Sequence, residues 1–131
     1  MIKLNPEEIP SWLQRFNSFN DAVIRRWQIG TTDSGVTYNL AIETMDSASA
    51  NTGWSKVTLQ FRDCTSFSYF CESSTNYNVL SNGMNILVDG PVIYADFGHF
   101  ASLPASLEEL MQSPCHAASP DIAWHAIEIG D

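Results

Sequence analysis

The cysteines and histidines are the residues of this 131-residue chain best suited to hold a metal ion. The set consists of Cys64, Cys71, Cys115, His99, His116 and His125. A zinc site usually takes two ligands from one strand or turn, as in His-x-x-x-His or Cys-x-x-Cys, and the sequence has neither spacing. Cys115 and His116 are adjacent, so their side chains diverge on an extended backbone. The odd separation of Cys64 and Cys71 places them on opposite faces of one strand. We therefore expect no metal site and no other cofactor.

The Cys115-His116 pair also suggests a cysteine hydrolase, in which a histidine activates a thiol. Catalytic partners of this kind meet in space from distant positions and are seldom adjacent in the chain. The surrounding segment 113–120 is rich in small residues, which favours a connecting loop without chemistry. The Gly-x-Ser-x-Gly signature of serine hydrolases is absent.

Asp96-Phe97-Gly98 matches the magnesium-binding triplet of protein kinases. The chain has no Gly-rich loop and no His-Arg-Asp, so a strand that ends in Phe-Gly is the better interpretation. Glu108-Glu109 lies in the first turn of a predicted helix, where acids favour the helix dipole. No spacing of carboxylates identifies a general acid with its base. We expect a non-enzymatic protein rather than an enzyme.

Asp96 and His99 are the candidates for a ligand-binding pocket, because they lie close to the predicted end of a strand, where sites gather. In this alternative the protein is a small-molecule-binding or enzymatic β-fold. Its pocket would be lined by aromatic residues such as Trp54, Tyr69, Tyr94 and Trp124. Aromatic residues at a period of two are more often part of the core.

The distribution of charge along the chain is uneven. All six Lys and Arg residues lie at or before Arg62, while acids continue to the last residue, and the net charge is −9. Proteins bind nucleic acids and anionic membranes through clustered bases, so we expect neither partner. Arg25-Arg26 is the one local pair of bases, and on a regular strand its members point to opposite faces.

The expected partner is therefore a basic protein, which an acidic face would attract. The candidate residues of that face are Glu72, Asp89, Asp96, Glu108 and Glu109. The alternative is that the acidity only keeps a small protein soluble.

Hydrophobic periodicity predicts a mainly β protein. Segment 5–19 forms an N-terminal helical piece, 22–97 a β-core, 104–113 a short helix and 122–129 a final strand. Alternation is cleanest at 57–62, and Asn82-Gly83 is a strong hairpin signal. Closely spaced strands favour one domain, 1–131: an antiparallel β-sandwich or strongly curved sheet with one or two short helices.

Location and assembly are less constrained. The first residues do not form a secretory signal, no apolar run spans a membrane, and the odd cysteine count argues against a disulfide framework. We expect a cytoplasmic protein. Sheet edges must be paired, covered or charged, so a homo-oligomer is also open.

Three stretches carry a resemblance to a known group: 20–24, 54–61, and 78–80 followed by a turn and another strand. They resemble small, mostly uncharacterised bacterial all-β proteins, some of which lie beside toxins as immunity proteins. The similarity covers 20–97 and rests on pattern; members often have His-Asp where this chain has Asn20-Asp21. The resemblance implies a compact, acidic, non-enzymatic binder, and it assigns no functional residue.

Overall fold

The computed structural model describes residues 1–33, 35–69 and 79–130. These residues form two antiparallel sheets, as the periodicity predicts. The six-stranded sheet has the order β1 (Ile2–Lys3), β10 (Asp121–Glu128), β4 (Trp54–Arg62), β3 (Gly35–Met45), β2 (Ala22–Thr32) and β6 (Val79–Leu80). The four-stranded sheet has the order β5 (Ser66–Tyr69), β9 (Cys115–Ser119), β8 (Val92–Phe97) and β7 (Met84–Asp89).

The helical elements are short. They are η1 (Pro6–Glu8), α1 (Ile9–Arg15), η2 (Asn17–Phe19) and α2 (Leu107–Leu110). Proline at the start of η1 and in the first turn of α1 suits positions that need no backbone N–H. The Ser106 hydroxyl caps α2 by accepting the Glu109 N–H at 3.1 Å.

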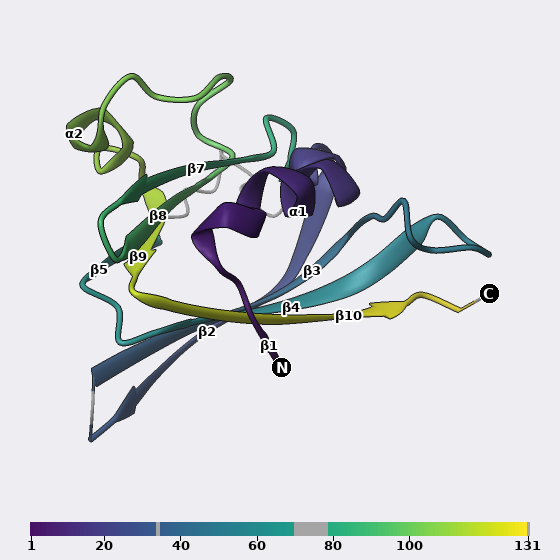
Figure 1. The fold of residues 1–131 in the computed structure, drawn as a ribbon, viewed down its shortest axis with the longest axis horizontal. Helices are drawn as coiled ribbons and strands as arrows, with labels where there is room; N and C mark the ends of the chain where they lie inside the picture. Colours follow the sequence, from purple (N-terminus) through teal and green to yellow (C-terminus); the bar gives the residue numbers. More distant parts are fainter. Residues whose placement is uncertain (34, 70–78, 131) are drawn as a thin grey trace.

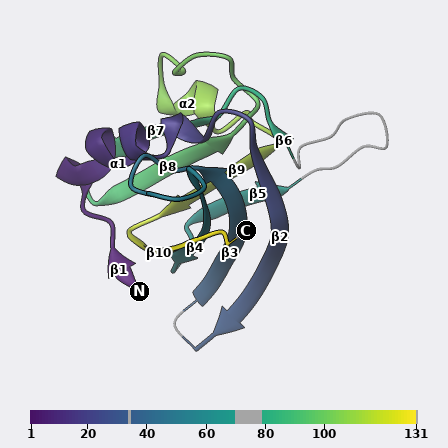
Figure 2. The ribbon, with the colours of Figure 1, turned by 90° about the vertical axis from the view of Figure 1, so that its right-hand side faces the viewer.

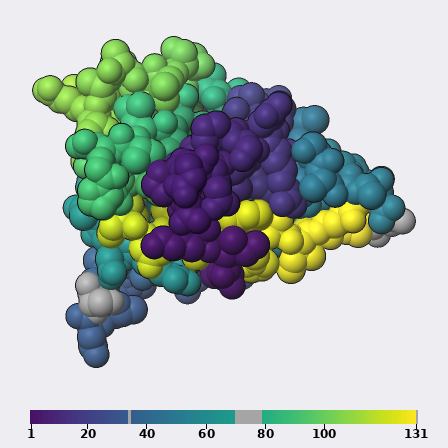
Figure 3. All heavy atoms as spheres, in the orientation of Figure 1, coloured from purple at the N-terminus to yellow at the C-terminus, as the bar shows by residue number. Residues whose placement is uncertain are grey.

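One face of the six-stranded sheet faces outward, and the second sheet and the helices cover its other face. Figure 1 shows the six-stranded sheet as one layer, with α1, the four-stranded sheet and α2 on the other side. Beyond this body, β2 and β3 run on together as a projecting arm (Figure 2). In Figure 3 the N-terminal residues, in purple, fill the space between the green layer of β7 and α2 and the yellow strand β10.

The core forms between these layers from alternating residues. Val57, Leu59 and Phe61 of β4 are at most 1% exposed, so Lys56, Thr58, Gln60 and Arg62 face the other way, along the outer face of the six-stranded sheet. Aromatic rings fill the end of the core beneath α1. Trp12 packs against Phe19 at 5.1 Å and against Trp124 of β10 at 6.1 Å.

The Asn82-Gly83 turn exists, but it does not make the expected hairpin. It joins β6 of one sheet to β7 of the other, so it is a crossover between the layers. Gly83 has a φ of 71°, and its N–H donates to the Leu80 carbonyl at 2.9 Å. A Cβ here would lie 2.4 Å from the Ser18 carbonyl oxygen, so close packing as well as the turn requires glycine.

The expected loop at 113–120 is also wrong for most of its length. Cys115–Ser119 is the buried strand β9, which lies between β5 and β8. Its small residues reflect a position in the middle of the sheet, where Ala117 and Ala118 are fully buried.

Candidate functional site

A β-bulge in β2 places Arg25 and Arg26 on the same face of the six-stranded sheet, its outer face. The register shifts between Ile24, which pairs with Ile42, and Arg26, which pairs with Ala41. The extra residue is Arg25, and a bulge places an added side chain beside its neighbour. Arg25 reaches Glu43 on the outer face at 3.1 Å, and Arg26 lines a hollow on the same face. The expectation that the two arginines point to opposite faces is therefore wrong, because it assumed a regular strand.

Five of the six bases lie on this outer face of the six-stranded sheet. They are Lys3, Arg25, Arg26, Lys56 and Arg62. Uncharged polar side chains lie between them, and Trp54 and Ile127, 36% and 61% exposed, lie at the end of the face next to Lys56. We call this surface the basic face.

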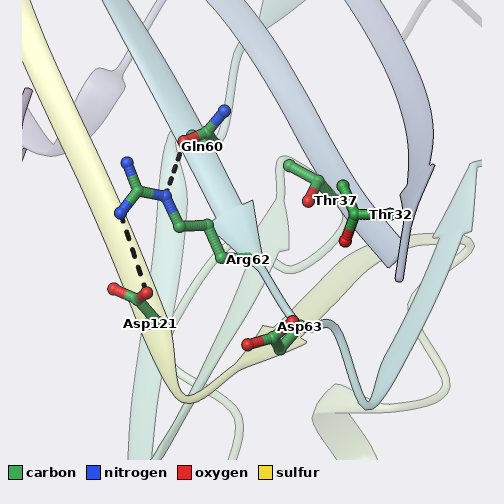
Figure 4. Close-up of a pocket in the computed structure, with 6 residues that line it drawn as sticks. All are labelled: Thr32, Thr37, Gln60, Arg62, Asp63 and Asp121. Atoms are coloured by element: carbon green, nitrogen blue, oxygen red, sulfur yellow. Dashed lines mark hydrogen bonds and ion pairs between the residues drawn. The ribbon is translucent and has the colours of Figure 1, made fainter. Parts of the chain in front are cut away.

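At the end of the basic face near Arg62, carboxylates balance the positive charge (Figure 4). The Arg62 guanidinium donates to the Gln60 side chain at 2.6 Å and lies 3.7 Å from the Asp121 carboxylate. These residues line a hollow of about 380 Å³ together with Thr32, Thr37 and Asp63. Two carboxylates and one guanidinium leave no excess of positive charge there.

The opposite side of the sandwich carries acids and a single base. That base, Arg15, donates from Nε and Nη2 to the two carboxylate oxygens of Asp46, at 2.8 and 3.1 Å. Burial alone would raise the pKa of Asp46. Hydrogen bonds from Arg15, the Ser55 hydroxyl and the Ala48 N–H outweigh burial and hold that pKa at about 2. The pair is therefore charged and satisfied at neutral pH.

The expected acidic face is present only in part. Asp89 is the last residue of β7 and Glu108 lies in α2, and both are exposed. Glu109 is half-buried, and its carboxylate accepts the Ala105 N–H at 3.2 Å. Glu72 lies outside the described residues. Exposed Glu7 and Glu8 of η1 add to this side, and we call Glu7, Glu8, Asp89, Glu108 and Glu109 the acidic side.

Asp96 does not belong to any exposed face, because it is fully buried. The Ser113 hydroxyl donates to Oδ1 at 2.6 Å, and the Asn85 amide donates to Oδ2 at 3.2 Å. The backbone N–H groups of His99 and Phe100 donate to the same carboxylate at 3.3 and 3.1 Å. Asp96 therefore ties both ends of segment 99–113 to β8. Sequence reasoning missed this role, since an Asp at the end of a strand gives no signal of burial.

The two residues of the expected pocket, Asp96 and His99, have different surroundings, since Asp96 is fully buried. His99 is exposed, and its ring contacts Phe100 at 4.7 Å. Neither residue lines any of five hollows on the described surface. The aromatic residues proposed for its walls are also apart: Trp124 is in the core, while Trp54 is on the basic face.

A serine–histidine contact was not expected from the sequence. His116 Nδ1 lies 2.8 Å from the Ser113 carbonyl oxygen, and its Nε2 lies 3.0 Å from the Ser66 hydroxyl. A carbonyl can only accept, so Nδ1 carries a proton and donates to Ser113. His116 is 6% exposed, and its contact with Ser66 joins β9 to β5.

Neither of the two cysteines that the structure describes has the features of an activated thiol. Burial raises the pKa of Cys64 to about 11, so its thiol is protonated at neutral pH, and Cys115 is fully buried. Cys71 lies outside the described residues. Within residues 1–33, 35–69 and 79–130, no three metal-ligating side chains come together. No helix in that part of the chain has the length and apolar character needed to cross a membrane.

Comparison of the chain with models of protein families, with curated proteins and with solved structures finds no match.

Proposed function

We propose that this protein is a non-enzymatic binding module that holds a basic protein partner against its acidic side. In its sharpest form it is an immunity-type protein that neutralises a basic toxin. One observation carries the proposal. In the described part of the chain, the acidic side has no Lys or Arg except Arg15, and the Arg15 guanidinium forms an ion pair with Asp46.

The acidic side offers exposed carboxylates that a basic protein surface could bind. Glu7, Glu8, Asp89 and Glu108 are exposed, and none of them has an ion-pair partner among the residues that the structure describes. Complementary charge of this kind accelerates encounter and disfavours wrong partners more than it adds affinity. The apolar contacts of a stable complex would come from a patch of about 800 Å² on each partner. Exposed Leu103, 57% accessible in the segment before α2, is suited to that patch.

The test compares two variants with the same change of charge. Glu7→Gln with Glu108→Gln removes two charges from the acidic side. Asp33→Asn with Asp63→Asn, the control, removes two exposed charges from other parts of the surface. Each protein is immobilised, exposed to lysate at low salt and at about 0.5 M salt, where exposed charges are screened, and the bound proteins are identified by mass spectrometry.

The proposal predicts a basic partner that wild type and the control retain, and that both the acidic-side variant and high salt release. The immunity form further predicts that this partner is encoded beside the gene for the chain. Equal retention by the acidic-side variant would contradict the proposed surface.

A further inference from the structure

The middle of the basic face contains a hollow of about 190 Å³ across strands β2, β3 and β4. It forms because Ala41 lies between larger neighbours: its cross-strand partners are Arg26 on β2 and Thr58 on β4. Because the Ala41 side chain is a single methyl group, it leaves a depression between the longer side chains on either side of it. The residues around the floor are Arg26, Gln28, Asn39, Lys56 and Thr58.

The charge of this hollow is positive and uncompensated. No carboxylate lines it, and among the described residues neither Arg26 nor Lys56 has an ion-pair partner. Glu43, the cross-strand neighbour of Lys56, directs its carboxylate to Arg25 at 3.1 Å. The hollow at Arg62 differs in this respect, because Asp63 and Asp121 line it (Figure 4).

We propose that this hollow binds the phosphate or sulfate group of a small monoester. Arg26 and Lys56 approach from strands on opposite sides of β3, so two positive charges surround one position, which suits a multiply charged anion. The Gln28, Asn39 and Thr58 side chains supply further donors around the same position. Such a ring of donors fits an anion with three or four oxygens better than a carboxylate with two.

A long polyanion fits this face poorly. Carboxylates interrupt the basic face on both sides of the hollow: Glu43 is the cross-strand neighbour of Lys56, and Asp63 and Asp121 line the separate hollow at Arg62. The chain also carries a net charge of −9. Nucleic-acid binding depends on many bases that each displace counterions. Among the described residues, this face offers three bases without an ion-pair partner: Lys3, Arg26 and Lys56. The ligand is therefore a small molecule with one charged group. This inference does not depend on the proposed partner of the acidic side, because the two surfaces lie on opposite sides of the sandwich.

The test is a titration of the ¹⁵N-labelled chain with sodium phosphate, sodium sulfate and sodium chloride at constant ionic strength. We expect saturable shifts at the amides of Arg26, Ala41 and Lys56 with phosphate or sulfate, and none with chloride. The Kd should be on the order of 1 mM, because a bare anion makes few contacts. The anion that binds more tightly identifies the ester class.

Three variants separate a site from general attraction. Arg26→Gln should weaken binding by about 10-fold or more, the usual effect of losing a charge-assisted hydrogen bond. Arg62→Gln makes the same change of charge on the same face and should leave the Kd within about twofold. Ala41→Val fills the hollow without a change of charge and should weaken binding as Arg26→Gln does.

Equal loss in the Arg26 and Arg62 variants would overturn the proposal, since it would mean diffuse attraction. Shifts that do not saturate, or tighter binding of a single-stranded oligonucleotide than of the simple anions, would also overturn it. Thermal unfolding of each variant verifies that it is folded.

Discussion

Both carboxylate oxygens of Asp46 accept hydrogen bonds from the guanidinium of Arg15, at 2.8 and 3.1 Å, although the two residues are separated by 31 positions. The pair attaches the end of α1 to the loop after β3. It also neutralises the one base on the acidic side. The Arg15 side chain is 34% exposed and that of Asp46 is 2% exposed, so the carboxylate depends on its protein partners for solvation.

Asp46→Asn should lower the free energy of unfolding by about 3 kcal/mol, because it leaves a guanidinium beside an amide that cannot accept both bonds in the same way. Urea unfolding at pH 7 measures the change. Asp33→Asn, an exposed site, should alter stability by less than about 0.5 kcal/mol. A similar small effect at Asp46 would contradict the stabilising role of the pair.

The same carboxylate predicts a pH dependence. Its pKa in the folded protein is about 2, below the ordinary value of 3.8. A depressed pKa contributes stability that is fully present above the unfolded-state value and is lost as pH falls through the folded-state value. Wild type should therefore lose about 2 kcal/mol between pH 5 and pH 2 from this group. The check is the difference in urea midpoint between wild type and Asp46→Asn: it should shrink toward zero at pH 2, and a constant difference would refute the assignment.

Asp96→Asn should destabilise the fold by about 2–4 kcal/mol, because the new amide group faces four donors in a buried position. The effect should concentrate in segment 99–113. Hydrogen exchange at the His99 and Phe100 amides, which donate to Asp96, should accelerate most. His99→Ala, at an exposed neighbour, serves as the control, and unchanged exchange in Asp96→Asn would argue against Asp96 as the anchor of this segment.

Gly83→Ala and Gly90→Ala form a matched pair, since both glycines have a positive φ, 71° and 58°. At Gly90 a Cβ meets nothing within 4 Å, so the cost is the strain of the left-handed backbone, about 1–2 kcal/mol. At Gly83 the Cβ would also meet the Ser18 carbonyl oxygen at 2.4 Å and the Asn20 side chain at 2.6 Å. Thermal unfolding should show a clearly larger loss for Gly83→Ala. Equal losses of stability in the two variants would mean that close packing of η2 against Gly83 does not add to the cost of the substitution.

The sequence was sufficient to predict the class of fold, and less so its connections. Alternation at Val57, Leu59 and Phe61 reports a strand with one buried face, because that face is set by local spacing. Pairing is set by distant contacts. The Asn82-Gly83 turn therefore looked like a hairpin, although its flanking strands join different sheets.

The candidate sites were harder to predict for similar reasons. A one-residue bulge reverses the face of every later side chain relative to a regular strand, and nothing in Arg25-Arg26 signals it. The burial of Asp96 depends on Ser113 and Asn85, which lie far from it in the chain. The uneven charge of the two halves was visible in the sequence. The placement of these charges on two opposite faces could be seen only from the strand register of β2, β3 and β4.

The separation of charge between the two faces can be measured residue by residue. Paramagnetic relaxation of the backbone amides by a cationic and by an anionic nitroxide cosolute reports the local electrostatic potential. The cationic probe should relax the amides of Glu7, Asp89 and Glu108 more strongly, while the anionic probe should prefer those of Arg26 and Lys56. A uniform preference for the cationic probe on both faces would contradict the account.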